Sequence, residues 1–154
     1  MAIYHLSVKT VKRSTGRSAV AAAAYRTATN LTDDRTGQTY DYTRKQGVEF
    51  SEILIPKTAP PFLSERNALW DSAEAAEKRK NSVTAREYEI ALPAEFDAEQ
   101  KKACVHDFSY WLVDRFAVGV DAAIHAPHRE GDQRNYHAHI LTTTRTIDNE
   151  GLAK

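Results

Sequence analysis

Three histidines in the last third of the sequence have the spacing of a metal site. His137 and His139 lie two residues apart in a segment that alternates like a strand, so their side chains leave the same face of a sheet. His125 lies in the preceding predicted strand, and antiparallel pairing of the two strands would bring the three imidazoles together. Neutral imidazoles bind divalent metals, and three protein ligands leave positions open for substrate oxygens. A His-x-His pair alone is often incidental, but the third histidine favours a metal site.

A tyrosine lies in an alanine-rich segment near the N-terminus. Ser18 is a natural N-cap for a helix from Ala19 to about Thr29, because its hydroxyl can accept a hydrogen bond from an orphan backbone N–H. Small neighbours leave the phenol of Tyr25 uncrowded in this helix. A tyrosine among alanines is more often an ordinary core aromatic, so the helix alone does not decide whether Tyr25 is a nucleophile.

Two carboxylates share one face of another predicted strand. Alternation puts Glu87 and Glu89 opposite Tyr88, Ile90 and Leu92. Two acids on one strand face can accept a proton or orient a histidine. A solvent-facing strand surface would show the same pattern, so both interpretations stay open.

The charges are unevenly distributed. Lysine plus arginine equals aspartate plus glutamate at 21 each, so the chain is not a polycation. Its first thirty residues nevertheless contain no acidic residue, and they contain Lys9, Lys12, Arg13, Arg17 and Arg26. Such a block can contact phosphates even when the total charge is zero, although a solvated basic face has the same composition.

Bulk properties indicate one globular domain. The chain has 154 residues, of which 42% are hydrophobic and 27% charged. It contains no apolar run long enough to cross a membrane and no signal-peptide layout at its start. The single cysteine, Cys104, excludes an internal disulfide and suits a reducing cytosol, so a cytoplasmic location is expected.

The hydrophobic periodicity predicts an α+β fold. Strands are expected at residues 3–8, 84–92, 120–126 and 136–144, helices at 19–29, 64–80 and from the Asp97 cap to 116, and a hairpin within 32–47. Strands separated by helices, with the last two joined by a hairpin-like loop, indicate one mainly antiparallel sheet covered by helices in a sandwich-like arrangement.

Motifs spread along the whole chain resemble the MobA/MobL family of plasmid relaxases. The segments are residues 1–10, 16–20 with Ala24-Tyr25-Arg26, 41–45, 87–93, 124–126 and 135–140. A match spread from end to end is improbable by chance. The family belongs to the HUH endonucleases, so the resemblance implies a metal held by three histidines on an antiparallel sheet.

Carried over residue by residue, the resemblance makes Tyr25 the nucleophile and His125, His137 and His139 the metal ligands. It leaves open which of Glu87 and Glu89 assists the tyrosine. The implied cofactor is a divalent ion, Mg²⁺ or Mn²⁺ first and Zn²⁺, Ni²⁺ or Co²⁺ as alternatives. Close relatives often have a further histidine where this sequence has Tyr136, whose alternation directs it to the other face of the strand.

The implied activity is nicking of single-stranded DNA at a plasmid origin of transfer. Metal-assisted transesterification would form a reversible 5′-phosphotyrosine and a free 3′-hydroxyl, and the strand would be rejoined after transfer. The expected backbone contacts are Lys9, Lys12, Arg13, Arg17, Arg26 and Arg44, and Tyr40 or Tyr42 could stack bases.

The resemblance also implies partners and a larger context. Accessory nicking-complex proteins and a coupling protein of the secretion machinery are expected, with a monomeric protein that is exported with the transferred strand. Residues 1–154 are expected to form one relaxase domain, shortened at its C-terminal end from a longer protein with a second enzymatic or primase-like region.

Three other functions compete with this interpretation. A rolling-circle replication initiator would use the same chemistry, but the N-terminal match argues against it. A non-catalytic origin-binding module would need the basic segment but not Tyr25 and the histidines. A zinc hydrolase would use the metal to activate water and would leave Tyr25 without a role.

Overall fold

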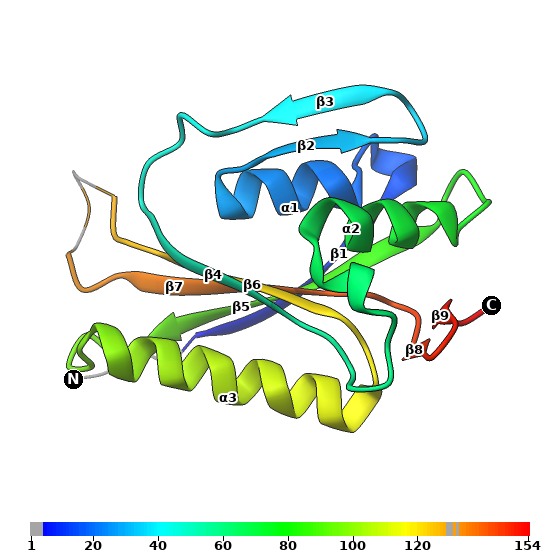
Figure 1. Cartoon of the computed structure of the whole chain (residues 1–154). Coiled ribbons are helices and arrows are strands. Elements are labelled where there is room, and N and C mark those ends of the chain that lie inside the picture. The colour runs from blue at the N-terminus through cyan, green and yellow to red at the C-terminus, as the bar shows by residue number, and fades with distance from the viewer. Residues whose placement is uncertain (1–4, 129–130, 132) are drawn as a thin grey trace.

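The computed structural model describes residues 5–128, 131 and 133–154. Within these residues, an antiparallel sheet of five strands has helices on both faces (Figure 1). Across the sheet the order is β1 (Leu6–Lys12), β5 (Val83–Leu92), β7 (Tyr136–Thr142), β6 (Val120–His125) and β4 (Val48–Leu54). The predicted α+β fold with a mainly antiparallel sheet is therefore confirmed.

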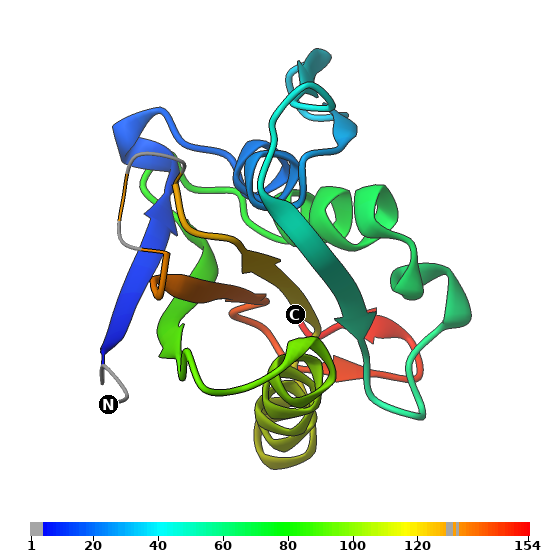
Figure 2. The ribbon, with the colours of Figure 1, turned by 90° about the vertical axis from the view of Figure 1, so that its left-hand side faces the viewer.

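Helices α1 (Ala19–Thr27) and α2 (Arg66–Ala75) cover one face of the sheet, and α3 (Ala98–Phe116) covers the other (Figure 2). A hairpin of β2 (Asn30–Asp33) and β3 (Gln38–Asp41) lies over α1 on the side away from the sheet (Figure 1). The shorter elements are η1 (Arg13–Thr15), η2 (Pro61–Ser64), β8 (Ile147–Asp148) and β9 (Gly151–Leu152). None of the helices in the described part of the chain is long and apolar enough to cross a bilayer.

Two hydrophobic cores follow from the alternation of the strands. Ile90 and Leu92 of β5 belong to the core beneath α3, together with Val105 and Leu112 of that helix. The opposite core, under α1 and α2, includes four alanines of α1 and Trp70. Small side chains let α1 approach the sheet closely, which brings its last turn to the sheet surface.

The N-terminus of α1 forms as predicted. The Ser18 hydroxyl accepts hydrogen bonds from the backbone N–H groups of Val20 and Ala21 and donates one to Asp33 at 2.8 Å. The helix ends at Thr27 rather than near Thr29, because Ala28 adopts a left-handed backbone with φ of 55°. Tyr25 therefore lies in the last turn of α1.

The two other helices differ in how well the sequence predicted them. Asp97 caps α3 with a capping box, as expected, and the helix ends at Phe116. The prediction for residues 64–80 was too long, since Glu65 is the cap and α2 ends at Ala75. One side of α2 is buried. Trp70 is fully buried, and its indole N–H donates to Asp121 at 2.9 Å.

The strands begin and end close to the predicted residues, with two exceptions. The first strand runs from Leu6 to Lys12, longer than predicted, and the predicted residues 3 and 4 lie outside the described residues. Strand β4 was not predicted, although it pairs with β6 and forms one edge of the sheet. Both of these strands lie at sheet edges, where one side of the backbone has no neighbouring strand.

Candidate active site

The pairing register gathers the predicted site residues on the sheet face that α1 covers. His125 of β6 lies directly opposite His137 of β7, and His139 lies opposite both Ala123 of β6 and Glu89 of β5. Residues opposite each other in an antiparallel pair leave the same face of the sheet. The three histidines and Glu89 therefore share one face, and the rings of His125 and His139 lie 4.3 Å apart, centroid to centroid.

Glu87 connects this face to α1. Its Oε2 accepts a hydrogen bond from Nε of Arg26 at 2.5 Å, and its side chain is only 4% exposed. Burial by itself raises the pKa of the Glu87 carboxyl, but the neighbouring His139 and Arg26 outweigh that effect and hold the pKa at about 2. Glu87 is therefore a buried carboxylate ion near neutral pH, not the solvent-facing acid that the sequence left open.

His139 faces the other oxygen of the same carboxylate. Its Nδ1 lies 3.5 Å from Oε1 of Glu87, too long for a full hydrogen bond, and this buried nitrogen has no hydrogen-bond partner among the described residues. A carboxylate beside one ring nitrogen is the usual means of orienting a histidine whose other nitrogen binds a metal. The position of Glu87 suits this orienting role toward His139.

His125 is fixed by the backbone of α1. Its Nε2 lies 2.7 Å from the carbonyl oxygen of Arg26. A carbonyl can only accept, so this nitrogen donates its N–H and Nδ1 keeps a lone pair. Burial, together with the charges of His139, Lys45 and Arg26, lowers the pKa of His125 to about 4 despite the hydrogen bond to Arg26. The imidazole is therefore neutral near pH 7 and able to act as a ligand or a base.

The lowered pKa of His125 predicts how the stability of the metal-free chain depends on pH. An unfolded histidine takes up its proton near pH 6.5, whereas the folded His125 does so only near pH 4. As the pH falls from 6.5 to 4, the unfolded state binds the extra proton first, so the free energy of unfolding should decrease across this window. Denaturant unfolding at stepped pH measures this decrease, which His125→Gln should reduce. An equal decrease in the free energy of unfolding of the variant would contradict the assignment of this pH dependence to His125.

Tyr25 lies at the mouth of the same cleft. Its side chain is half-exposed, at 46%, in the last turn of α1, one residue before Arg26. The cleft has a volume of about 690 Å³, and its charged or titratable lining side chains are Lys9, Tyr25, Arg26, Lys45, Glu87, Glu89, His125, His128 and His139. The structure thus brings Tyr25, both glutamates and two of the three predicted histidines to one cavity. His137 is on the same sheet face but does not line the cleft.

The donor groups in the cleft fit a divalent cation. Among the described residues, Glu87, Glu89 and His139 form a compact group whose ligand atoms all lie within 4.8 Å of one another. Carboxylate oxygens suit Mg²⁺ and Mn²⁺, and imidazole nitrogens suit Zn²⁺, Co²⁺ and Ni²⁺. The compact group differs from the three imidazoles predicted from the sequence, because it contains only one of them.

The predicted DNA-contacting cations fall into two groups, which are paired with buried carboxylates or exposed at the surface. Arg13 donates to the Glu74 carboxylate at 2.7 Å with its side chain only 10% exposed, and the guanidinium of Arg26 is engaged by Glu87. These two arginines hold the fold and the site together, so both leave the set of proposed DNA contacts. Lys9, Lys12, Arg17 and Arg44 are exposed.

Lys45 is a cleft residue that the sequence interpretation missed. It follows directly after Arg44 in the family-like segment 41–45, and its ammonium lies 3.6 Å from the centroid of the Tyr25 ring. The one feature of the sequence that could have identified Lys45 is its position in segment 41–45, which resembles the family. A lysine in a short basic run is usually a solvated surface residue, which hid its contact with Tyr25.

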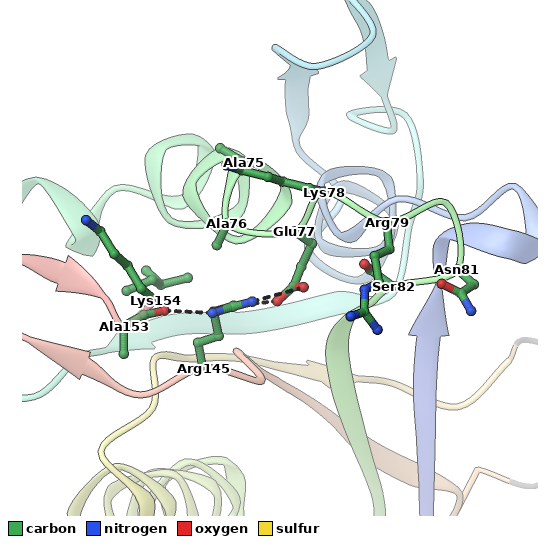
Figure 3. A pocket seen from close by; sticks show the side chains of 11 residues that line it. Ala75, Ala76, Glu77, Lys78, Arg79, Asn81, Ser82, Arg145, Ala153 and Lys154 are labelled. Atoms are coloured by element: carbon green, nitrogen blue, oxygen red, sulfur yellow. Dashed lines mark hydrogen bonds and ion pairs between the residues drawn. The ribbon is translucent and has the colours of Figure 1, made fainter.

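A second cavity, of about 860 Å³, lies where α2 ends, beside Lys154 (Figure 3). One of its cations is Arg145, which pairs with Glu77 and donates to the carbonyl of Ala153 at 3.0 Å (Figure 3). None of the predicted site residues lines this cavity. Tyr25, Glu87, Glu89, His125 and His139 instead line the cleft beside α1.

Curated proteins of similar sequence match nearly the whole chain. The chain is 41% identical to "Mobilization protein MobL" of Acidithiobacillus ferridurans over 98% of this chain and 45% of that protein. It is 37% identical to "Conjugal transfer protein TraA" of Rhizobium radiobacter over 99% of this chain and 14% of that protein. The chain thus spans less than half the length of these curated relatives.

A solved structure is also similar. The structure reported as "Molecular Basis of Vancomycin Resistance Transfer in Staphylococcus aureus" is 35% identical, with a TM-score of 0.90 over 99% of this chain and 76% of that one. Residues 17–154 match the MobA/MobL family. The match covers most of the chain and includes every predicted metal-ligand and nucleophile position, so this protein belongs to the MobA/MobL family.

Proposed function

We propose that the chain is a relaxase domain that nicks single-stranded DNA at an origin of transfer, with Tyr25 as the nucleophile. The observation that carries the proposal is the shared cleft of Tyr25, Glu87, Glu89, His125 and His139. The names of the relatives support it, since they include mobilization proteins, conjugal transfer proteins and a "43 kDa relaxation protein" of Salmonella typhimurium. In this proposal residues 1–154 form one domain of a longer protein.

The proposed reaction exchanges one phosphoester for another. The Tyr25 oxygen forms a bond to phosphorus while the bond from phosphorus to the 3′ oxygen breaks. The phenol proton is lost to a base, and the 3′ oxygen gains a proton, so the products are a 5′-phosphotyrosine and a 3′-hydroxyl. Because the bond made resembles the bond broken, the reverse step can rejoin the strand.

A divalent cation is proposed to be held by His125, His137 and His139. When bound, it supplies positive charge that neutralises the phosphate oxygens. Glu87 orients His139, and Arg26 fixes Glu87 while its carbonyl fixes His125. Arg26 therefore ties the helix that carries the nucleophile to the strands that carry the imidazoles.

One group in the cleft is suited to receive the phenol proton. Glu89 is less enclosed than Glu87, with a side chain 22% exposed and an ion pair to Lys9 at 3.9 Å. His125 has no lone pair for this proton while it holds the cation, because one ring nitrogen donates to the Arg26 carbonyl and the other is the metal ligand. Glu87, which is fixed between Arg26 and His139, is assigned to orientation rather than proton transfer.

The proposed substrate is a single strand that passes over the cleft. Lys9 lines the cleft, and Lys12, Arg17 and Arg44 are exposed cations for backbone phosphates. The same proposal includes accessory nicking proteins and a coupling protein as partners. It also includes a monomeric state, a cytoplasmic location and export with the strand.

End-labelled strands test the proposed function. With Mg²⁺ or Mn²⁺ present, an origin strand labelled at its 3′ end should leave its label on the protein in a denaturing gel. The same strand labelled at its 5′ end should release a shortened free oligonucleotide. A hydrolase would release both fragments without protein-linked label, and a binding module would leave the strand intact. Adduct formation on a replication origin instead of a transfer origin would favour the rolling-circle initiator.

A further inference from the structure

We propose that the segment Asp41–Lys45 positions the nucleophile, with Tyr42 and Lys45 holding the Tyr25 ring and Lys45 stabilising the charge that develops on it. The inference rests on the proposed function, since it concerns the same tyrosine. It gives a role in the reaction to Tyr42 and Lys45, which the steps described above do not use.

The segment is fixed by its own backbone. The N–H of Tyr42 donates to the carbonyl of Thr29 at 3.1 Å, just beyond the end of α1. The Asp41 carboxylate accepts from both the N–H and the hydroxyl of Thr43, at 3.0 Å and 2.6 Å. The N–H of Lys45 closes a turn onto the carbonyl of Tyr42 at 2.9 Å. Tyr42 and Lys45 are therefore presented to α1 from a defined turn.

Both side chains contact Tyr25. The Tyr42 ring meets the Tyr25 ring edge-on, at 5.2 Å between centroids and an interplanar angle of 90°. The Lys45 ammonium lies 3.6 Å from the Tyr25 centroid and also donates to the Tyr25 carbonyl at 2.9 Å. A ring that is 46% exposed in the last turn of a helix is thus held by two groups from another segment.

The position of Lys45 has a chemical consequence. As the phenol attacks, it loses its proton, and the negative charge spreads from the oxygen into the ring. A fixed cation beside the ring stabilises that charge as it forms. No carboxylate of the described residues lies within ion-pair distance of Lys45, in contrast to Arg26 beside it. Its charge is therefore available to Tyr25 rather than neutralised by an acid.

Substitution of Lys45 separates positioning from DNA binding. Lys45→Met should slow single-turnover adduct formation at saturating DNA by roughly tenfold, the size expected for one partly exposed cation–π contact. The Kd for the strand should change by less than about threefold, since one phosphate contact at most is lost. Lys45→Arg, which keeps the cation, should recover the rate to within about threefold of the unsubstituted chain. Lys102→Met is the matched control, because Lys102 lies 5.5 Å over the Phe50 ring on the other side of the sheet.

NMR of the DNA-free chain provides a readout without activity. Lys45→Met and Tyr42→Leu should each shift the ring-proton resonances of Tyr25, whereas Lys102→Met should not. Unchanged Tyr25 resonances in both variants would overturn the positioning role. The charge-stabilising role would be overturned if Lys45→Met changed only the Kd and left the rate of adduct formation unchanged. It would also be overturned if Lys45→Arg failed to restore that rate. If the unsubstituted chain forms no adduct, the proposed function fails, and the resonances alone decide whether the segment positions Tyr25.

Discussion

Tyr25→Phe should bind the origin strand with an affinity close to that of the unsubstituted chain and form no covalent adduct. The substitution removes only the phenolic oxygen. The ring and its contacts with Tyr42 and Lys45 remain, so the shape of the cleft is kept. Loss of a nucleophile typically reduces turnover by on the order of 10⁴-fold or more. A denaturing gel measures the adduct, and fluorescence anisotropy measures binding.

The matched control for this variant is Tyr110→Phe. Tyr110 is 53% exposed on α3, on the sheet face opposite the cleft, so its hydroxyl should have no part in the reaction. Tyr110→Phe should therefore form adduct as the unsubstituted chain does. An undiminished adduct with Tyr25→Phe would remove Tyr25 from the mechanism.

Removal of divalent metal should also stop cleavage while leaving much of the DNA binding intact. The cations that contact the strand are side chains, whereas the neutral imidazole of His125 brings no positive charge of its own to the phosphate near pH 7. EDTA should therefore abolish the adduct, and Mn²⁺ added in excess should restore it. Cleavage that continues in EDTA would count against a metal site in this cleft.

Variants distinguish the two sets of ligands that the cleft offers. If the imidazoles hold the ion, His137→Ala and His139→Ala should both abolish Mn²⁺ binding measured by EPR. Glu87→Gln should weaken it roughly 10- to 100-fold through the orientation of His139. Glu89→Gln should change it by less than about threefold. Loss of binding in Glu89→Gln with retention in His137→Ala would instead assign the ion to the compact group of Glu87, Glu89 and His139.

Local signals in the sequence predicted much of the fold. The Ser18 and Asp97 caps mark helix starts because each side chain satisfies backbone N–H groups within three residues of itself. The shared face of Glu87 and Glu89 follows from strand alternation alone. Strand β4 was missed because an edge strand buries less apolar surface. Its Glu49 and Glu52 weaken the hydrophobic pattern of Val48–Leu54.

Long-range pairing explains what the sequence could not show at the site. Arg26 and Glu87 are 61 residues apart, and no local pattern identifies them as a buried ion pair. The same holds for Arg13 and Glu74. In both cases the arginine lies in an N-terminal block without acidic residues, which favoured the prediction of a phosphate contact. Tertiary packing instead pairs it with a buried carboxylate of this chain. The burial of Glu87, which decides its charge and its role, likewise depends on α1 lying over β5.

Peptide mapping of the DNA-linked residue tests the central claim most directly. The chain is incubated with a labelled origin strand and Mn²⁺, the covalent product is digested with protease, and the labelled peptide is sequenced by mass spectrometry. The account predicts a phosphotyrosine at Tyr25 in the α1 peptide. A nucleotide attached to Tyr40, Tyr42 or any other residue, or cleavage with no attached nucleotide, would contradict it.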